Sequence, residues 1–73
     1  MNLRLTHHAQ AQMCMRGITA SMIAEAIRQA DSRKAAPGGA LACEKKIENG
    51  ILRVICKRLG DKEAYLVLTA YYR

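Results

Sequence analysis

The sequence predicts an α+β domain in which two N-terminal helices pack on a three- to four-stranded antiparallel sheet. Two stretches with helix-capping residues fill the first part of the chain, the dipeptide Asn49-Gly50 joins two strand-like runs, and a third strand-like run follows them. With 73 residues, the chain lies near the lower limit for folding without metal or disulfide staples. We therefore expect a single domain, residues 1–73.

The first helix is expected over residues 7–16. Thr6 can cap its N-terminus, and Gly17 suits the left-handed conformation that often follows a helix. At 100° per residue, one side of this helix carries a polar ridge between apolar flanks. The ridge consists of His8, Gln12 and Arg16.

The second helix is expected to begin at Ala20, because Thr19 is a suitable N-cap. Its apolar residues gather on one side, so this helix should pack on a sheet. Residues 31–35 are either a short edge strand or a basic connector, and Pro37-Gly38-Gly39 is a loop. The apolar side consists of Met22, Ile23, Ala26, Ile27 and Ala30.

Residues 41–47 and 51–58 are expected to form a hairpin. A two-residue turn at Asn49-Gly50 would set Lys46 opposite Arg53 and Cys43 opposite Cys56. Like charges directly opposite each other destabilise a sheet unless they are solvated or an anion lies between them. The hairpin therefore predicts an anion site.

The third strand is expected over residues 63–72, after a turn at Gly60-Asp61. Strict alternation would give it two half-buried faces, one toward the helices and one toward a partner or substrate. One face would carry Tyr65, Val67, Thr69 and Tyr71, and the other Ala64, Leu66, Leu68, Ala70 and Tyr72.

The composition indicates a basic protein with an aliphatic core. Twelve Lys and Arg residues against six Asp and Glu residues give a formal charge of +6, and the chain has no Trp or Phe. Such a charge favours polyanionic partners, either nucleic acid or an acidic protein, although it also suits a merely solvated surface. The three cysteines, without a signal-peptide pattern, favour free thiols in the cytoplasm, and no run is long enough to span a membrane.

The candidate chemistry lies in a cationic cluster of Lys46, Arg53 and Lys57. Cleavage of RNA needs cations to stabilise charge on the phosphate and groups that move protons, and Lys, Arg, Tyr and His supply both. Tyr71 can stack on a base, and His8 either carries a proton or bridges helix and sheet by hydrogen bonds. We expect no metal, because His7 and His8 point about 100° apart on a helix and no Cys-x-x-Cys or His-Glu-x-x-His spacing accompanies them. We also expect no cofactor, since the chain has no phosphate-binding glycine loop.

Several short segments, in order, resemble a small bacterial family grouped with the RelE-, ParE-, HigB- and BrnT-like plasmid toxins. The resemblance implies a RelE-like architecture, cleavage of free or ribosome-bound mRNA, and an acidic antitoxin that covers the basic face. It maps activity to Lys46, Arg53 and Tyr71. The matching segments are His8-Ala9, Met13, Arg16-Gly17-Ile18, Leu52-Arg53-Val54 and Val67-Leu68-Thr69-Ala70-Tyr71.

The first functional hypothesis is a metal-independent endoribonuclease toxin that acts on mRNA. The second is a non-catalytic module that binds RNA or protein with the same face, and the third is a small structural homodimer formed through Leu66 and Leu68. For the first hypothesis the catalytic candidates are His8, Lys46, Arg53 and Tyr71, and the RNA-binding candidates are Arg16, Lys46, Arg53 and Lys57.

Overall fold

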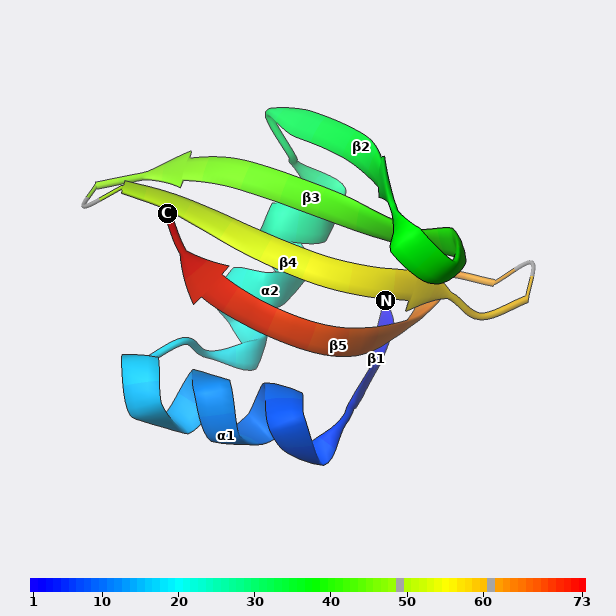
Figure 1. Cartoon of the computed structure of the whole chain (residues 1–73), viewed down its shortest axis with the longest axis horizontal. Helices are drawn as coiled ribbons and strands as arrows, with labels where there is room; N and C mark the ends of the chain where they lie inside the picture. The colour runs from blue at the N-terminus through cyan, green and yellow to red at the C-terminus, as the bar shows by residue number, and fades with distance from the viewer. Residues whose placement is uncertain (49, 61) are drawn as a thin grey trace.

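The computed structural model describes residues 1–48, 50–60 and 62–73 of the chain. These residues form two α-helices, a short 3-10 turn and a five-stranded mixed sheet with the strand order β1-β5-β4-β3-β2 (Figure 1). In chain order the elements are β1 (Asn2–Leu5), α1 (His7–Arg16), α2 (Ala20–Arg28), β2 (Ser32–Ala36), the 3-10 turn η1 (Pro37–Gly39), β3 (Ala40–Ile47), β4 (Gly50–Arg58) and β5 (Ala64–Tyr72).

The prediction of a three- to four-stranded antiparallel sheet was wrong. Over the described residues the sheet has five strands, and β1 runs parallel to β5, with Leu3 opposite Tyr65 and Leu5 opposite Val67. The sequence pattern missed β1 because a four-residue strand carries little periodicity and its partner lies at the other end of the chain. Residues 31–35 do contribute an edge strand, β2, which pairs with β3.

Helix α1 is attached to β5 through its N-cap. The Thr6 hydroxyl accepts a hydrogen bond from the Ala9 N–H at 3.0 Å and donates one to the Leu68 carbonyl oxygen at 3.0 Å. The Thr6 N–H also donates to the Val67 carbonyl oxygen at 3.1 Å. Gly17 ends the helix with a φ of 65°. The predicted helix and both of its ends are confirmed, and α1 lies alongside β5 (Figure 1).

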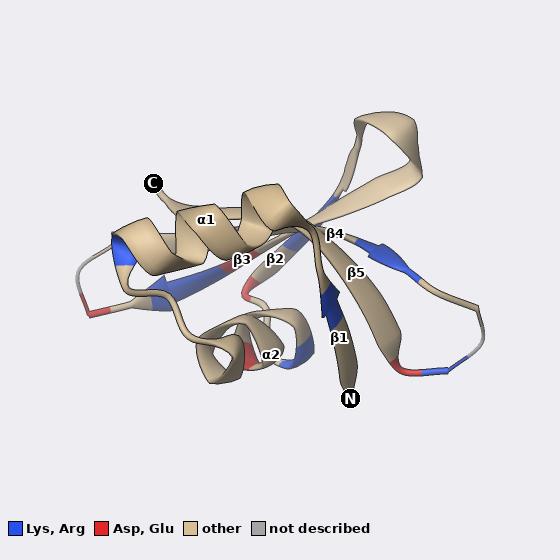
Figure 2. Ribbon diagram, turned by 90° about the horizontal axis from the view of Figure 1, so that it is seen from below, with Lys and Arg blue, Asp and Glu red and all other residues tan. Residues whose placement is uncertain are grey.

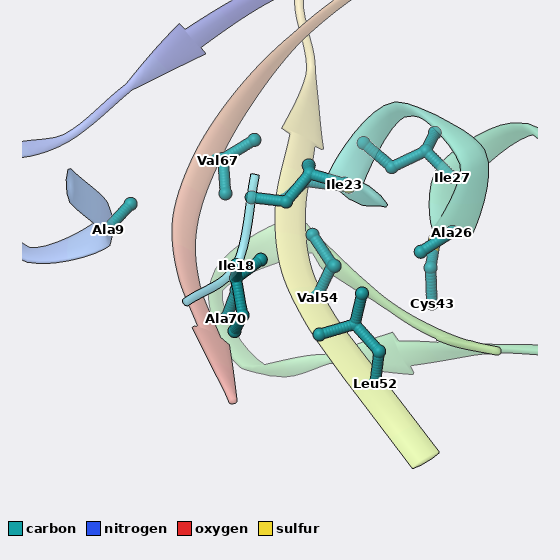
Figure 3. Packing of buried hydrophobic residues seen from close by; sticks show 11 residues of the cluster. Ala9, Ile18, Ile23, Ala26, Ile27, Cys43, Leu52, Val54, Val67 and Ala70 are labelled. Carbon is teal, nitrogen blue, oxygen red and sulfur yellow. The ribbon is translucent and has the colours of Figure 1, made fainter. Parts of the chain in front are cut away.

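Helix α2 supplies most of the helical side of the core. Thr19 caps it, accepting a hydrogen bond from the Met22 N–H at 3.1 Å. Its buried side chains face the sheet, where the helix packs on β3 and β4 and Ala26 lies next to Cys43 (Figure 3), as the apolar side of the sequence predicts. The core gathers Ile23, Ala26 and Ile27 from the helix with Cys43, Leu52, Val54, Cys56, Val67 and Ala70 from the sheet.

The opposite face of the sheet carries no helix among the described residues. Figure 1 shows α2 behind the sheet and α1 beside β5, so that the face toward the viewer is open. We call it the open face. The strand registers bring several cations onto it, and Lys and Arg recur along β1, β2, β3 and β4 (Figure 2). These open-face cations are Arg4, Lys34, Lys46, Arg53 and Lys57.

The hairpin of β3 and β4 has a different register from the predicted one. Arg53 lies opposite Glu44, and Lys46 lies opposite Ile51. Each residue of β3 therefore pairs with the β4 residue two positions before the predicted one. Gly50 pairs with Ile47 inside the ladder, where its φ is 145° and an added Cβ would come within 3.1 Å of the Arg73 carbonyl oxygen. Asn49 of the predicted turn lies outside the described residues, as does Asp61 of the second.

Charge explains why the slipped register is preferred. A two-residue slip leaves every side chain on the same face, so the hydrophobic pattern fits both registers equally well. The predicted register sets two cations, Lys46 and Arg53, directly opposite each other, whereas the observed one sets Arg53 opposite the carboxylate of Glu44. Opposite charges in such pairs are stabilising and like charges destabilising.

A β-bulge in β5 interrupts the strict alternation predicted for this strand. Ile55 pairs with Thr69 but Cys56 pairs with Val67, which leaves Leu68 as the extra residue. The bulge moves Tyr65 and Tyr71 to different faces: Tyr65 packs on the core, while Tyr71 lies beside Arg53 on the open face. The predicted grouping of these two tyrosines on one face was therefore wrong.

Replacing Ile23 by Ala should destabilise the domain by about 2–5 kcal/mol, because it leaves a cavity under the sheet where Ile23 is fully buried. That is a large part of the about 5–15 kcal/mol by which a domain is stable. Met15→Ala is the control, since Met15 is 77% exposed. Urea unfolding measures the free energy of unfolding of both variants. If Ile23→Ala were as stable as Met15→Ala, the packing of Ile23 under the sheet would be contradicted.

Candidate nucleic-acid interface

One row of residues crosses four strands of the open face. The registers set Ser32 of β2 opposite Glu44 of β3, Glu44 opposite Arg53 of β4, and Arg53 opposite Tyr71 of β5. We call these four residues the charged row. Directly opposed side chains on one face lie close enough to interact, so the row places a carboxylate, a guanidinium and a phenol next to one another.

Glu44 lies between two arginines. Its Oε2 accepts hydrogen bonds from Nη1 of Arg53 at 2.8 Å and from Nη1 of Arg73 at 2.5 Å. Arg73 is held in place by its backbone, because its N–H donates to the Ile51 carbonyl oxygen at 2.8 Å. Glu44 is only 9% exposed, and among the described residues it is the one charged side chain that is buried. A nearly buried carboxylate is tolerated here because both partners are charged donors.

This environment keeps Glu44 ionised. The hydrogen bond from Arg73 lowers the pKa of Glu44; burial opposes this effect, and the hydrogen bond from Arg53 adds to it. The carboxylate is therefore charged at neutral pH, and its charge holds the two guanidinium groups on one side of the sheet. Nε of Arg53 is buried without a hydrogen-bond partner in the described chain, whereas the Arg53 side chain as a whole is 27% exposed.

The predicted site residues on the sheet share the open face. Arg53 and Tyr71 are direct cross-strand neighbours. Lys46 lies diagonal to Arg53, since it pairs with Ile51 two positions away, so the predicted direct pair is replaced by a diagonal one. Lys57 is on the same face of β4 as Arg53, two side chains further along that face, and pairs with Leu66.

The two helical candidates stand apart from the charged row. His8 is exposed in the first turn of α1, next to the point where Thr6 bonds to Val67 and Leu68, whereas Tyr71 lies further along β5. Arg16 is exposed in the last turn of the same helix. The described structure does not bring either residue into contact with the carboxylate of Glu44.

Sequence reasoning missed Glu44 and Arg73. The predicted register put Glu44 opposite Ile55, where a carboxylate has no charged partner. The signal that could have found it is charge matching: of two registers that keep the same faces, one pairs Glu44 with Arg53. Arg73 follows the last predicted strand, and its pairing with Ile51 becomes visible only when β5 is extended by one residue.

A hollow of about 410 Å³ lies beside the charged row. Asp31 closes one side, and its Oδ2 accepts a hydrogen bond of 2.6 Å from the Lys46 N–H. The Asp31 N–H in turn donates to the Glu44 carbonyl oxygen at 2.8 Å, which fixes this corner of β2 to β3. The residues that line the hollow are Asp31, Ser32, Glu44, Lys45, Lys46 and Ile51.

The cysteines lie away from this face, and all three are free thiols. Cys43 pairs with Val54 rather than with Cys56, which corrects the predicted pairing, but both thiols are buried as expected. A hydrogen bond from Cys56 lowers the pKa of Cys43 to about 7; burial opposes this effect, and Arg33 adds to it. With 1% exposure, Cys43 is shielded from reagents in solution.

The chain belongs to the family described as a domain of unknown function, DUF4258, whose match covers residues 5–72. That match includes both helices, the hairpin and β5. It shows that the chain belongs to this family, and the family description assigns no activity. Comparison with curated proteins and with solved structures gives no match. Neither described helix is long and apolar enough to cross a membrane.

Replacing Glu44 by Gln should destabilise the protein at pH 7, because two guanidinium groups lose their shared anion. The folded-state pKa of Glu44 is lowered, so its stabilising contribution is present above the unfolded-state pKa and is lost as pH falls through the folded-state value. The difference in free energy of unfolding between wild type and variant should therefore shrink from pH 7 to pH 3.

Urea unfolding at several pH values measures that difference. Glu25→Gln on the exposed side of α2 makes the same change of charge away from the arginines and is the control. A Glu44→Gln difference that stays constant with pH would show that the carboxylate is not bound to Arg53 and Arg73.

Proposed function

We propose that the open face binds RNA and cleaves it without a metal ion, as the toxin of a toxin–antitoxin pair similar to the RelE-like toxins. The observation that carries the proposal is the carboxylate of Glu44 held between Arg53 and Arg73, with Tyr71 beside Arg53. A carboxylate, two guanidinium groups and a phenol are sufficient for cleavage by the 2′-hydroxyl of the RNA itself.

In this mechanism the scissile phosphate binds to Arg53 and Arg73. Glu44 takes the proton of the 2′-hydroxyl, whose oxygen forms a bond to phosphorus while the bond from phosphorus to the 5′-oxygen breaks. The Tyr71 hydroxyl gives its proton to the departing 5′-oxygen. The products are a 2′,3′-cyclic phosphate and a 5′-hydroxyl end, and the two guanidinium groups stabilise the negative charge that builds on the phosphate.

The ion pairs of the free protein are compatible with this role. A phosphate competes with Glu44 for the guanidinium donors, which it can reach because the side chains of Arg53 and Arg73 are 27% and 49% exposed. When the donors turn to the phosphate, the carboxylate loses the hydrogen bonds that lower its pKa and becomes a stronger base. Binding of substrate thus activates the group that takes the proton.

The remaining open-face cations suit a long polyanion. Lys46, Lys57, Lys34 and Arg4 extend from the charged row across the sheet, where they can follow an RNA backbone. The formal charge of +6 supports the same partner, and it equally supports an acidic antitoxin that covers the face between rounds of activity. The RNA substrate proposed from the family resemblance is mRNA, free or on the ribosome.

The test is cleavage of a labelled RNA by the purified protein in the presence of EDTA. Arg53→Ala should lower the rate by about 10²–10³, the usual cost of removing one donor to a developing oxyanion. Glu44→Gln should lower it by about 10²–10⁴, the usual contribution of a general base. Arg28→Ala, on the exposed side of α2, is the control and should retain the wild-type rate.

Expression of the wild type should arrest growth, and expression of Arg53→Ala should not. Circular dichroism establishes that each variant is folded. If Arg53→Ala cut RNA and arrested growth like the wild type, this assignment would fail. If the wild type retained RNA without cutting it, with an affinity that fell steeply as salt was added, the non-catalytic RNA-binding module would replace the nuclease.

A further inference from the structure

The hollow beside the charged row shares a wall with the proposed phosphate site. Glu44 lines the hollow and also binds Arg53 and Arg73, so a group in the hollow lies next to a phosphate held by these arginines. Its volume of about 410 Å³ lies in the range of about 300–1,000 Å³ that is usual for small-molecule sites. A group of the same nucleotide or of the next one would come within reach of the hollow when a phosphate binds to these arginines.

The walls of the hollow offer acceptors and one apolar surface. Asp31 uses Oδ2 to hold the Lys46 N–H, while its Oδ1 takes part in no hydrogen bond among the described residues. Ser32, at the same corner, has a hydroxyl that donates or accepts. Ile51, the apolar residue of the lining, is half-buried on the open face and presents a surface on which a flat ring can pack.

The chemistry of the lining argues against an anion or a metal ion as the occupant. Within the lining, Asp31 and Glu44 balance the charges of Lys45 and Lys46, so the hollow has no net positive charge that would favour a second phosphate. A hard cation would have to share the Glu44 carboxylate with Arg53 and Arg73 and to lie beside the ammonium groups of Lys45 and Lys46, which repel it. A neutral, flat group that carries hydrogen-bond donors fits both the shape and the charge.

We propose that this hollow is a base-binding site that prefers guanine, an inference that rests on the proposed RNA-cleaving function. Guanine presents two neighbouring N–H donors, at N1 and N2, on its Watson–Crick edge, and a carboxylate such as Asp31 can accept from both. Adenine, cytosine and uracil each place an acceptor on that edge, which a carboxylate repels. Single-stranded RNA is commonly read in this way, through base edges and stacking.

The experiment measures binding of the four nucleoside 3′-monophosphates to the purified protein by NMR titration. Guanosine 3′-monophosphate should bind about tenfold more tightly than the other three, in line with the discrimination of one bidentate contact to a base. Asp31→Asn should remove this preference while keeping the fold, because an amide oxygen can still accept from the Lys46 N–H. Glu25→Gln on α2 is the matched control and should retain the preference.

Equal binding of the four nucleotides by the wild type, or a guanine preference that survives in Asp31→Asn, would overturn the base site. The cleavage assay separates this failure from that of the nuclease. If the protein cut RNA equally well at all four bases, the nuclease proposal would hold and the base site would be rejected. A guanine preference that is lost in Asp31→Asn, together with uncut RNA, would support the base site and reject the nuclease.

Discussion

The ion pair between Glu44 and Arg53 is the interaction on which the open face depends. It joins β3 to β4, and the second bond of the same carboxylate, to Arg73, extends the contact to the end of β5. Without the Glu44 carboxylate, the two guanidinium groups would lie close to each other with no negative charge between them. Because Glu44 is nearly buried, its carboxylate needs partners, and in the free protein the two guanidinium groups satisfy it. The carboxylate thus sets the strand register and gathers the two guanidinium groups.

The two faces of the sheet differ in their structural role. Helix α2 and part of α1 cover one face and bury an aliphatic core, which is all that a chain of 73 residues can build. The other face is left with cations, one carboxylate, a tyrosine and partly buried aliphatic side chains. Residues that the core does not need are therefore free to form a binding surface, and the rigid ladder beneath them fixes their spacing. This arrangement is the physical basis for placing the proposed RNA site on the sheet.

Local signals in the sequence were enough for the helices and the main strands. Thr6, Gly17 and Thr19 act through contacts with near neighbours in the chain, so their roles are readable from the sequence. Strand β1 and the bulge at Leu68 depend on partners far away in the chain and were not readable. In the candidate site, Arg53 and Tyr71 were named together because of the family resemblance, since strict alternation groups Tyr71 with the core residues Tyr65 and Val67. Glu44 was missed because two registers satisfy the same alternation and differ only in their charge pairs.

The central claim is that Arg53 and Arg73, held by Glu44, form the site that receives an RNA phosphate. The most direct measurement is an NMR titration of the labelled protein with an RNA whose 2′-hydroxyl groups are methylated, so that it binds without being cut. The side-chain Nε–H signals of Arg53 and Arg73 and the backbone signals of the charged row should shift together and saturate at the same RNA concentration. Shifts confined to α1 or α2, with the arginine signals unchanged, would contradict the account.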